Sequence, residues 1–343
     1  MEAPFGGDVW FDRLEVGGWP CSPDGRPRAM LRFLIRRVLS GVLVMWLVTT
    51  VVFLLFFATS RDPAARFAGK SATPETLALL RHRMGLDEPL PLQYWHFVTR
   101  LLSGDLGYSY ATRSPVDGLI ENALPVTVSL VCGAAVLWLL TGVVTGVISA
   151  TRARSVVDRG ITTVVILGMS VPVFVTAATL LYLLAFKLPV FPLGGYVPLH
   201  EDPAEWFYHL MLPWITGALL QSAVYTRLTR GSLLDVLDED YVRTARAKGL
   251  SERRVVYRHG LRSALTPIVT QFGMDLGAVL GGALVTETVF GLQGMGELTV
   301  RSMTSGDLPV IMAVVLLAAL GTVVANILVD AAYAILDPRV RLT

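Results

Sequence analysis

Long, strongly apolar segments are the feature that most restricts the fold of this chain. A helix needs about 20 apolar residues to cross a hydrocarbon layer about 30 Å thick. Six segments are predicted to do so, at about 34–59, 123–151, 160–186, 209–230, 264–290 and 308–336. Only 16% of all residues are charged, whereas soluble domains carry about a quarter. The sequence therefore predicts an all-α integral membrane protein with six transmembrane helices.

Arginine gathers in the short segments that flank these spans, which predicts the orientation of the chain. Cytoplasmic loops carry an excess of Lys and Arg. The flanking arginines are Arg28, Arg32, Arg36, Arg37, Arg152, Arg154, Arg159, Arg227, Arg230, Arg339 and Arg341. We therefore expect both termini and the segment 235–262 to lie in the cytoplasm. The net charge of +2 forms no basic stripe, so nucleic-acid binding is excluded.

The chain is divided into a short leading part and one membrane domain. Residues 1–29 are rich in Gly, Pro and Asp and contain no apolar block, so we expect a disordered extension or a misassigned start. A single transmembrane domain is predicted to cover 30–343. Its external loop, 60–122, shows three helix starts, near Thr73, Leu92 and Pro115. A stripe of Leu92, Trp95, Val98 and Leu102 is expected to pack on the membrane domain rather than on a partner.

No motif in the sequence predicts catalysis, a metal site or a bound cofactor. Gly69-Lys70-Ser71 ends like a phosphate-binding loop, but Ala64 stands where that motif needs a glycine. The five histidines show no metal-ligand spacing and the two cysteines are too few and too far apart for a disulfide framework. We therefore predict a protein that is not an enzyme.

The segment Tyr241 to Leu265, "YVRTARAKGLSERRVVYRHGLRSAL", is the most charged part of the chain. Acids precede it, and acids at a helix start with bases at its end suit the helix dipole. Asp238 or Glu239 would cap a first short helix that ends at Gly249, and Ser251 would cap a second. An ordinary cytoplasmic loop would also be positively charged, but this does not explain why the acids precede the bases. We therefore expect a helical corner that docks into a cleft on a partner.

Several motifs resemble one family. The charged segment is similar to the EAA loop of bacterial ABC-importer permeases, with Arg243-Thr244-Ala245 and Gly249 at the motif positions and His259 to Arg262 downstream. The form "YVRTARAKGLSE" resembles that of the dipeptide, oligopeptide and nickel permeases. The segments "GLDEPLPLQYWHFVTRLLSGDLGYSYATRSPV", "TETVFGLQGMGEL" and "NILVDAAYAILDPRVR" resemble the external loop and closing motifs of the same group. The likeness runs from Met30 to the end.

The resemblance implies a type I ABC importer permease fold in the bacterial cytoplasmic membrane. The chain would form half of a pathway for di- or oligopeptides, beside a second homologous permease. Two partner ATPases would bind ATP and Mg, an extracytoplasmic binding lipoprotein would deliver the peptide, and lipid would surround the complex. Nickel or glutathione as substrate stays open. A stand-alone secondary transporter is disfavoured because only Asp275 is a convincing intramembrane acid.

The resemblance also assigns residues to the joint with the ATPase. The small side chains of this segment would let it approach the ATPase closely. The basic side chains would form polar contacts around that interface. The residues of this coupling segment are Glu239, Asp240, Tyr241, Arg243, Thr244, Ala245, Arg246, Ala247, Lys248, Gly249 and Leu250.

The fifth apolar segment is the candidate lining of the pathway. An acid inside a span is costly and points to function, and Asp275 could attract the amino terminus of a peptide. A hydrogen bond between helices is the alternative for Asp275. The full candidate set is Gln271, Gly273, Asp275, Gly277, Gly281, Thr286 and Glu287. Gly142 and Gly146 in the second segment are expected to serve packing.

Overall fold

The structure, a computed structural model, describes residues 25–59, 64, 73–83, 86–280 and 283–336. The described part is helical, with one isolated β-bridge between Tyr108 and Pro115. Its α-helices are α1 (Gly25–Thr59), α3 (Pro74–Arg83), α4 (Leu90–Leu102), α5 (Val116–Thr151), α6 (Val156–Ser170), α7 (Val173–Leu180), α8 (Pro203–Leu237), α9 (Asp240–Ala247), α10 (Glu252–Arg254), α11 (Leu261–Leu280), α12 (Leu284–Val289), α13 (Met295–Ser305) and α14 (Leu308–Leu336). Two π-helical segments cover Leu181–Lys187 and Val255–Gly260. Most of the expected extension 1–29 and the Gly69–Ser71 motif lie outside the described residues.

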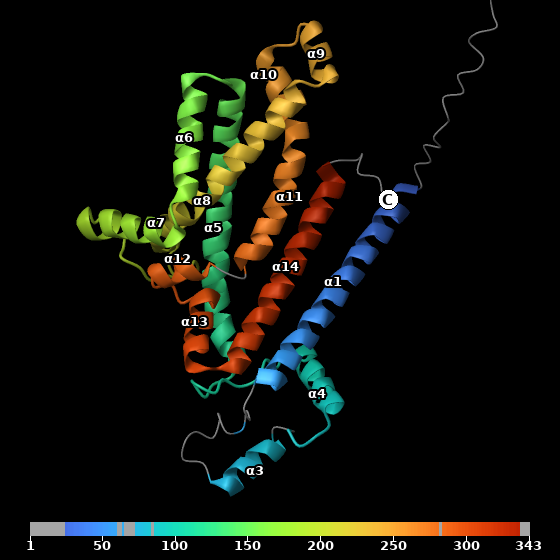
Figure 1. The fold of residues 1–343 in the computed structure, drawn as a ribbon, viewed down its shortest axis with the longest axis vertical. Coiled ribbons are helices and arrows are strands. Elements are labelled where there is room, and N and C mark those ends of the chain that lie inside the picture. The colour runs from blue at the N-terminus through green and yellow to red at the C-terminus, as the bar shows by residue number, and fades with distance from the viewer. Residues whose placement is uncertain (1–24, 60–63, 65–72, 84–85, 281–282, 337–343) are drawn as a thin grey trace, which may run out of the picture.

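Five long helices, α1, α5, α8, α11 and α14, run along the long axis of the molecule (Figure 1). The start of α1, the α5–α6 turn and the α8–α11 junction gather at one end, which we call the arginine-rich end. Helices α3 and α4 lie at the opposite end. These three flanking segments, which the sequence places on one side of the membrane, therefore share one end of the molecule, whereas Arg339 and Arg341 lie outside the described residues.

The core lies where α5 packs against α8, which is the most extensive helix pair. Glycines on α5 allow this close approach. A Cβ atom at Gly133 would lie 2.0 Å from Trp214 Cε2, and one at Gly146 would lie 2.5 Å from Thr229 Cβ. Gly142 meets Tyr225 in the same way. The packing role predicted for Gly142 and Gly146 is thereby confirmed.

Three described helices are long and apolar enough to cross a membrane alone, at Ile35–Phe56, Val116–Thr151 and Leu308–Val329. They correspond to the first, second and sixth predicted segments. The predicted segments 209–230 and 264–290 fall on α8 and on α11 with α12. Both α8 and α11 are long, but they are less apolar than the other three.

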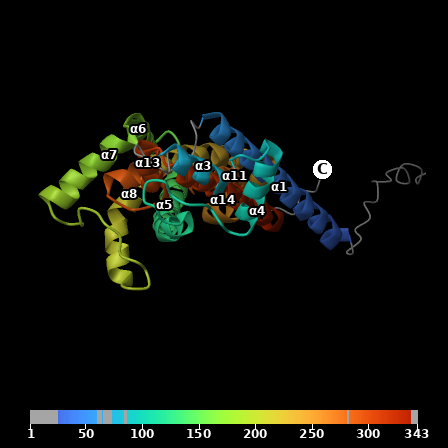
Figure 2. The same ribbon diagram turned by 90° about the horizontal axis from the view of Figure 1, so that it is seen from below.

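The third predicted segment, 160–186, is not one straight helix. Helix α6 ends at Ser170, and the chain resumes as α7 after a bend of 101°. Pro172 causes the break, since the residue before a proline is pushed out of the helical region, and Val171 is extended with φ −94° and ψ 126°. Figures 1 and 2 show α7 leaving the bundle across its long axis. Counted as one broken span, this pair makes a fourth candidate.

Helix α4 packs on α1 through a different face from the predicted one. Tyr94 lies 5.2 Å from Phe53 between ring centroids and its hydroxyl contacts Thr50 Oγ1 at 2.8 Å. Leu92, Trp95 and Leu102 of the predicted stripe remain 43%, 62% and 82% exposed. The expectation that this stripe packs on the rest of the chain was therefore wrong. Because the apolar side chains of α4 cover a wide arc, in which Tyr94 and Phe97 lie beside the predicted stripe, helical periodicity alone does not decide which part of that arc is buried.

Candidate functional site

The charged segment folds as a helical corner at the arginine-rich end (Figure 1). Helix α9 begins after Glu239, whose extended backbone starts the helix without a side-chain cap. It ends at Gly249, where φ is +76°, a value that suits glycine at a helix C-terminus. The Leu250 N–H then reaches the Ala245 carbonyl at 3.4 Å. The predicted boundaries of this helix and its glycine stop agree with the structure.

One face of α9 is fixed against the rest of the chain. Val242 is 0% and Ala245 is 7% exposed, and both pack on Val255 together with Leu237 and Leu250. Ala245 was expected among the small residues that seat against a partner. The structure places it inside this chain instead, where it lets α9 lie close to the π-helical segment after α10.

An ion pair closes the corner. Arg246 Nη2 lies 2.8 Å from Glu252 Oε1, and Arg246 also donates to the Leu237 carbonyl at 3.3 Å. The hydrogen bond from Arg246 lowers the pKa of the Glu252 carboxyl, and that same bond raises the pKa of Arg246. Arg246 therefore braces the corner, and Glu252 is a site residue that the sequence analysis did not single out. Its place at the start of a basic helix was the available signal.

The outward face of α9 is open to solvent. This outward face consists of exposed residues at helical spacing, namely Asp240, Arg243, Thr244, Ala247 and Lys248. Arg243 lies 3.4 Å from Asp240 within this face. Tyr241 flanks it and its hydroxyl contacts Ser263 Oγ at 3.1 Å. A small side chain, Ala247, lies between charged ones, which suits insertion into a groove.

A buried charge pair holds α8 just before the corner. Arg230 on α8 donates two hydrogen bonds to the Asp158 carboxylate, at 2.8 and 2.9 Å. Ser149 on α5 and the backbone N–H of Arg154 donate to the same carboxylate. Asp158 is 4% exposed. The ends of α5, α6 and α8 are thus tied together, a relationship between distant residues that no local sequence pattern predicted.

The glycines of the candidate pathway pack against α14. A Cβ atom at Gly273 would lie 2.5 Å from Val329 Cγ2, and one at Gly277 would lie 2.8 Å from Thr322 Cγ2. Thr322 also donates to the Gly277 carbonyl at 2.9 Å. The structure therefore places both glycines in a helix contact. Gly281 lies outside the described residues.

Asp275 lies at the contact between α11 and α8. The Tyr225 hydroxyl donates to its Oδ2 at 2.8 Å, and Gln271 Nε2 donates to its Oδ1 at 2.9 Å. The carboxylate is half-buried, whereas Tyr225 is fully buried. The hydrogen bond between helices that the sequence left as an alternative is present. Tyr225 was not foreseen, because nothing in the sequence pairs it with Asp275.

Thr286 and Glu287 lie inside the protein. Glu287 is 0% and Thr286 is 8% exposed. The Glu287 carboxylate accepts hydrogen bonds from the backbone N–H groups of Gly296 and Glu297 at 2.8 and 3.0 Å. It thus holds the start of α13. In this conformation, neither Thr286 nor Glu287 is open to a passing ligand.

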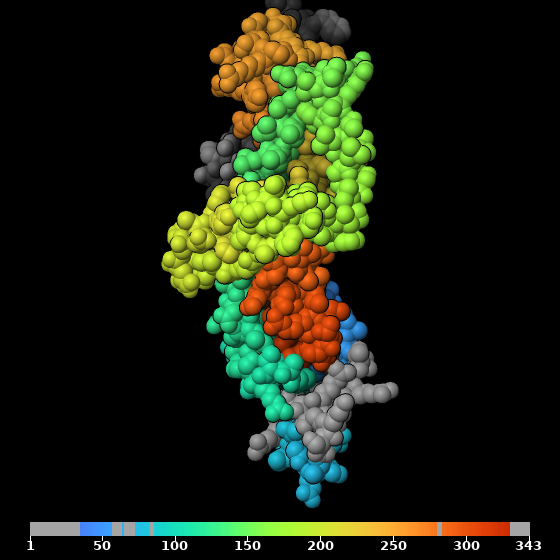
Figure 3. Space-filling view, turned by 90° about the vertical axis from the view of Figure 1, so that its left-hand side faces the viewer, coloured from blue at the N-terminus to red at the C-terminus, as the bar shows by residue number. Residues whose placement is uncertain are grey.

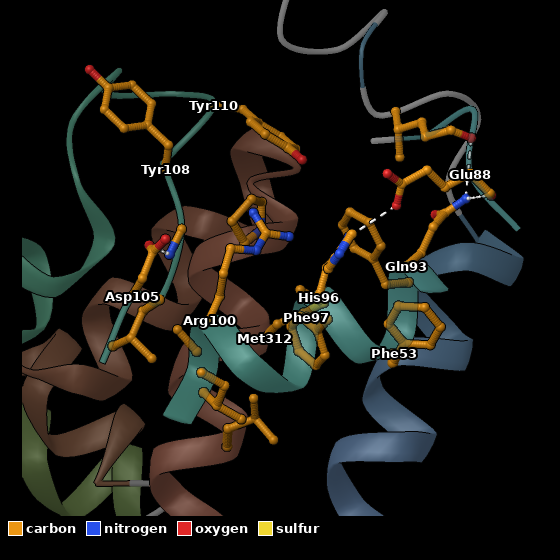
Figure 4. A pocket seen from close by; sticks show the side chains of 18 of the residues that line it. Phe53, Glu88, Gln93, His96, Phe97, Arg100, Asp105, Tyr108, Tyr110 and Met312 are labelled. Atoms are coloured by element: carbon orange, nitrogen blue, oxygen red, sulfur yellow. Dashed lines mark hydrogen bonds and ion pairs between the residues drawn. The ribbon is translucent and has the colours of Figure 1, made fainter. Parts of the chain in front are cut away.

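Two hollows mark the surface of the described part. An apolar groove of about 690 Å³ lies between α5, α6, α7 and α8 and is visible in Figure 3 beside α6. A cavity of about 300 Å³ lies at the opposite end. Figure 4 shows Phe53 of α1, Phe97 and Arg100 of α4, and Met312 of α14 around it. Among the described residues, no group of His, Cys, Asp and Glu could hold a metal ion.

Comparison with known proteins supports the resemblance found in the sequence. Residues 142–342 match the family "Binding-protein-dependent transport system inner membrane component", and residues 30–131 match its N-terminal part. A probable peptide ABC transporter permease of Sinorhizobium fredii is 40% identical over 309 residues, covering 90% of this chain and 99% of the relative.

Two further relatives cover the same length. A putative peptide transport system permease of Brucella abortus is 38% identical over 312 residues, covering 91% of this chain and 99% of the relative. A glutathione transport system permease of Escherichia coli has the same identity and coverage. The resemblance to ABC-importer permeases is confirmed, and the chain belongs to the binding-protein-dependent transport system inner membrane components, as a non-catalytic membrane subunit.

Proposed function

We propose that this chain is one of the two permease subunits of an ATP-driven importer of di- and oligopeptides, and that it forms half of the pathway. The observation that carries the proposal is the outward face of α9. It is a solvent-exposed helical face on a corner whose other side is fixed by Val242 and by the Arg246–Glu252 pair. A rigid, exposed helix at one end of a membrane protein is suited to receive force from a partner.

The arginine-rich end faces the cytoplasm in this proposal, as the positive-inside rule requires. The α6–α7 pair, α8, and α11 with α12 and α13 then complete six crossings with the three apolar helices. A broken helix is tolerated in a membrane where protein covers its free backbone groups. Contacts of α12 with α7 and α13 supply such cover.

Membership of the family implies ATPase and binding-protein partners. The finer proposal is a heterodimer with a second homologous permease, served by two ATPases that bind ATP and Mg and by an extracytoplasmic binding lipoprotein. Closure of the ATPases would move α9, and the move would pass to α8 because Leu237 and Asp240 are separated by only two residues. The Arg230–Asp158 pair would carry it on to α5 and α6.

Peptides are the favoured substrate because two relatives, which cover 90% and 91% of this chain, are named for peptide transport. Glutathione is the second candidate, since an equally similar relative is named for it. Glutathione is itself a small peptide, so the two substrates ask for similar chemistry: a free ammonium group and carboxylates.

The first test is a pull-down of the tagged chain from its native membranes in mild detergent. We expect a second permease, ATPase subunits and a binding protein to be recovered, together with ATP-driven peptide uptake by the reconstituted complex. Ala247→Trp, on the outward face, should lose the ATPases and retain the second permease. Recovery of the chain alone, with proton-driven uptake, would contradict the proposal.

The matched control is Arg253→Trp. Arg253 is exposed on the same corner but belongs to α10 and not to the outward face. It should retain all partners. Loss of the ATPases in both variants would mean that the corner as a whole, rather than this face, had been disturbed.

A further inference from the structure

Asp275 is a carboxylate within the fifth predicted span, 264–290, and it lies where α11 contacts α8. Both of its observed partners, the Tyr225 hydroxyl and the Gln271 amide, are neutral. Within the described residues, no basic side chain forms an ion pair with it. Acids at membrane depth are costly, and they are usually paired or lie on a substrate route.

The position of Asp275 on α11 leaves it partly open. Gly273 and Gly277 face α14, and Phe272 and Leu276 face the core. Met274, on the remaining side, is 53% exposed. At 100° per residue, Asp275 and Gln271 lie between the core side and this exposed side. Asp275 therefore borders an open face of α11 rather than a closed contact.

The carboxylate is held firmly but is not saturated. An ionised carboxylate offers about four lone-pair sites, and two are used. Tyr225 is fixed because it is 0% exposed and lies 6.5 Å from the Trp138 ring, which is itself 6.2 Å from Phe272. Such support by packed neighbours orients a binding group without filling it.

We propose that Asp275 binds the positively charged amino group of the transported molecule, with Tyr225 and Gln271 as positioning residues. The ligand class is a primary ammonium compound, in keeping with the free amino terminus of a peptide. This inference rests on the proposed function, because only a molecule in transit reaches this depth. A charge-assisted hydrogen bond between ammonium and carboxylate is about twice as strong as a neutral one, so recognition by one carboxylate is measurable.

The test uses the complete importer in nanodiscs, without the binding protein, so that the selectivity of that protein does not enter. The probes are a dipeptide with a photoreactive leucine analogue and its N-acetylated form. We expect the free-amine probe to label peptides from α8 and α11 of the wild-type chain. Asp275→Asn should lower this labelling about tenfold, and Asp275→Glu should restore part of it.

The second variant, Tyr225→Phe, separates binding from structure. It removes the hydrogen bond from Tyr225 to Asp275 but leaves the carboxylate, so labelling by the free-amine probe should fall less than in Asp275→Asn and should still exceed labelling by the N-acetylated probe. Equal labelling by both probes, absence of labelling in the wild type, or equal loss in Tyr225→Phe and Asp275→Asn would each overturn the assignment. Failure of the proposed function is distinguishable, because the wild-type complex, reconstituted in proteoliposomes together with its binding protein, would then show no ATP-driven peptide uptake.

Discussion

The Glu287 carboxylate on α12 accepts a hydrogen bond from Thr127 Oγ1 on α5 at 2.6 Å, although 160 positions separate the two residues. Because the same carboxylate holds the N–H groups of Gly296 and Glu297, it joins three helices at one buried point. Gly294 makes room for it, since a Cβ atom there would lie 2.4 Å from Glu287 Cδ. Glu287 therefore fixes the connection between α12 and α13.

Removal of the Glu287 carboxylate should destabilise the protein. In Glu287→Ala, three donors, two of them buried, lose their acceptor, so we expect a loss of about 3 kcal/mol or more in the free energy of unfolding. Thermal unfolding of the purified chain in detergent measures it. The matched control is Glu297→Ala, whose side chain forms a partly exposed pair with Arg301 and should cost about 0–1 kcal/mol. Similar losses in both variants would argue against a special role for Glu287.

A methyl group at Gly146 should push α5 away from α8. The added Cβ would lie 2.5 Å from Thr229 Cβ and 2.9 Å from the Thr226 carbonyl oxygen. Overpacking of this kind costs about 1–3 kcal/mol. Gly160→Ala is the control, because nothing lies within 4 Å of the new atom and alanine favours the helix. We expect Gly146→Ala to lower and Gly160→Ala to maintain or raise the unfolding temperature. The reverse order would contradict the α5–α8 contact.

Substitution of Gly249 tests the corner through its backbone. The position is open, with no atom within 4 Å of a built Cβ, but its φ of +76° is unfavourable for most residues. Gly249→Leu should therefore uncouple ATP hydrolysis from uptake while membrane insertion stays intact. Asparagine adopts positive φ more readily, so Gly249→Asn should keep most of the coupling. The ratio of peptide uptake to ATP hydrolysis in proteoliposomes checks both, and equal uncoupling would point to side-chain size instead.

Acid should loosen the corner through Glu252. Its pKa in the folded protein is depressed below the ordinary value of 4.5 by the hydrogen bond from Arg246. The stability from this pair is therefore present above the ordinary value and is lost as the pH falls through the lowered one. Both side chains are well exposed, so the effect is modest. The protection of α9 amides against hydrogen exchange should fall over that range in the wild type, but not in Glu252→Gln. Identical pH profiles in the wild type and in Glu252→Gln would show that the Arg246–Glu252 pair does not stabilise the corner.

Much of the architecture could be predicted because hydrocarbon length is a strict requirement. The runs that became α1, α5 and α14 are apolar over their whole span, and Gly249 ends α9 as its backbone freedom suggests. The break at Pro172 was missed, because the residues on both sides of it are apolar and hydropathy alone does not distinguish a bent span from a straight one. The sequence also could not show that Ala245 faces inward and Ala247 outward, because this depends on Val255, which packs against Ala245 from a later segment of the chain. The pairs Asp158–Arg230 and Tyr225–Asp275 join separate helices, and one sequence carries no signal for such contacts.

Helix α8 is continuous over 35 residues, which corresponds to a rod about 52 Å long at 1.5 Å per residue. It begins at Pro203 and ends at Leu237, and only Asp238 and Glu239 separate it from α9, which starts at Asp240. If such a rod tilts by about 10° around one end, the other end moves by about 9 Å. The length of α8 alone therefore turns a small rotation at the corner into a larger displacement at the far end of the helix. The ATPases then move the corner by less than the far end of α8 moves.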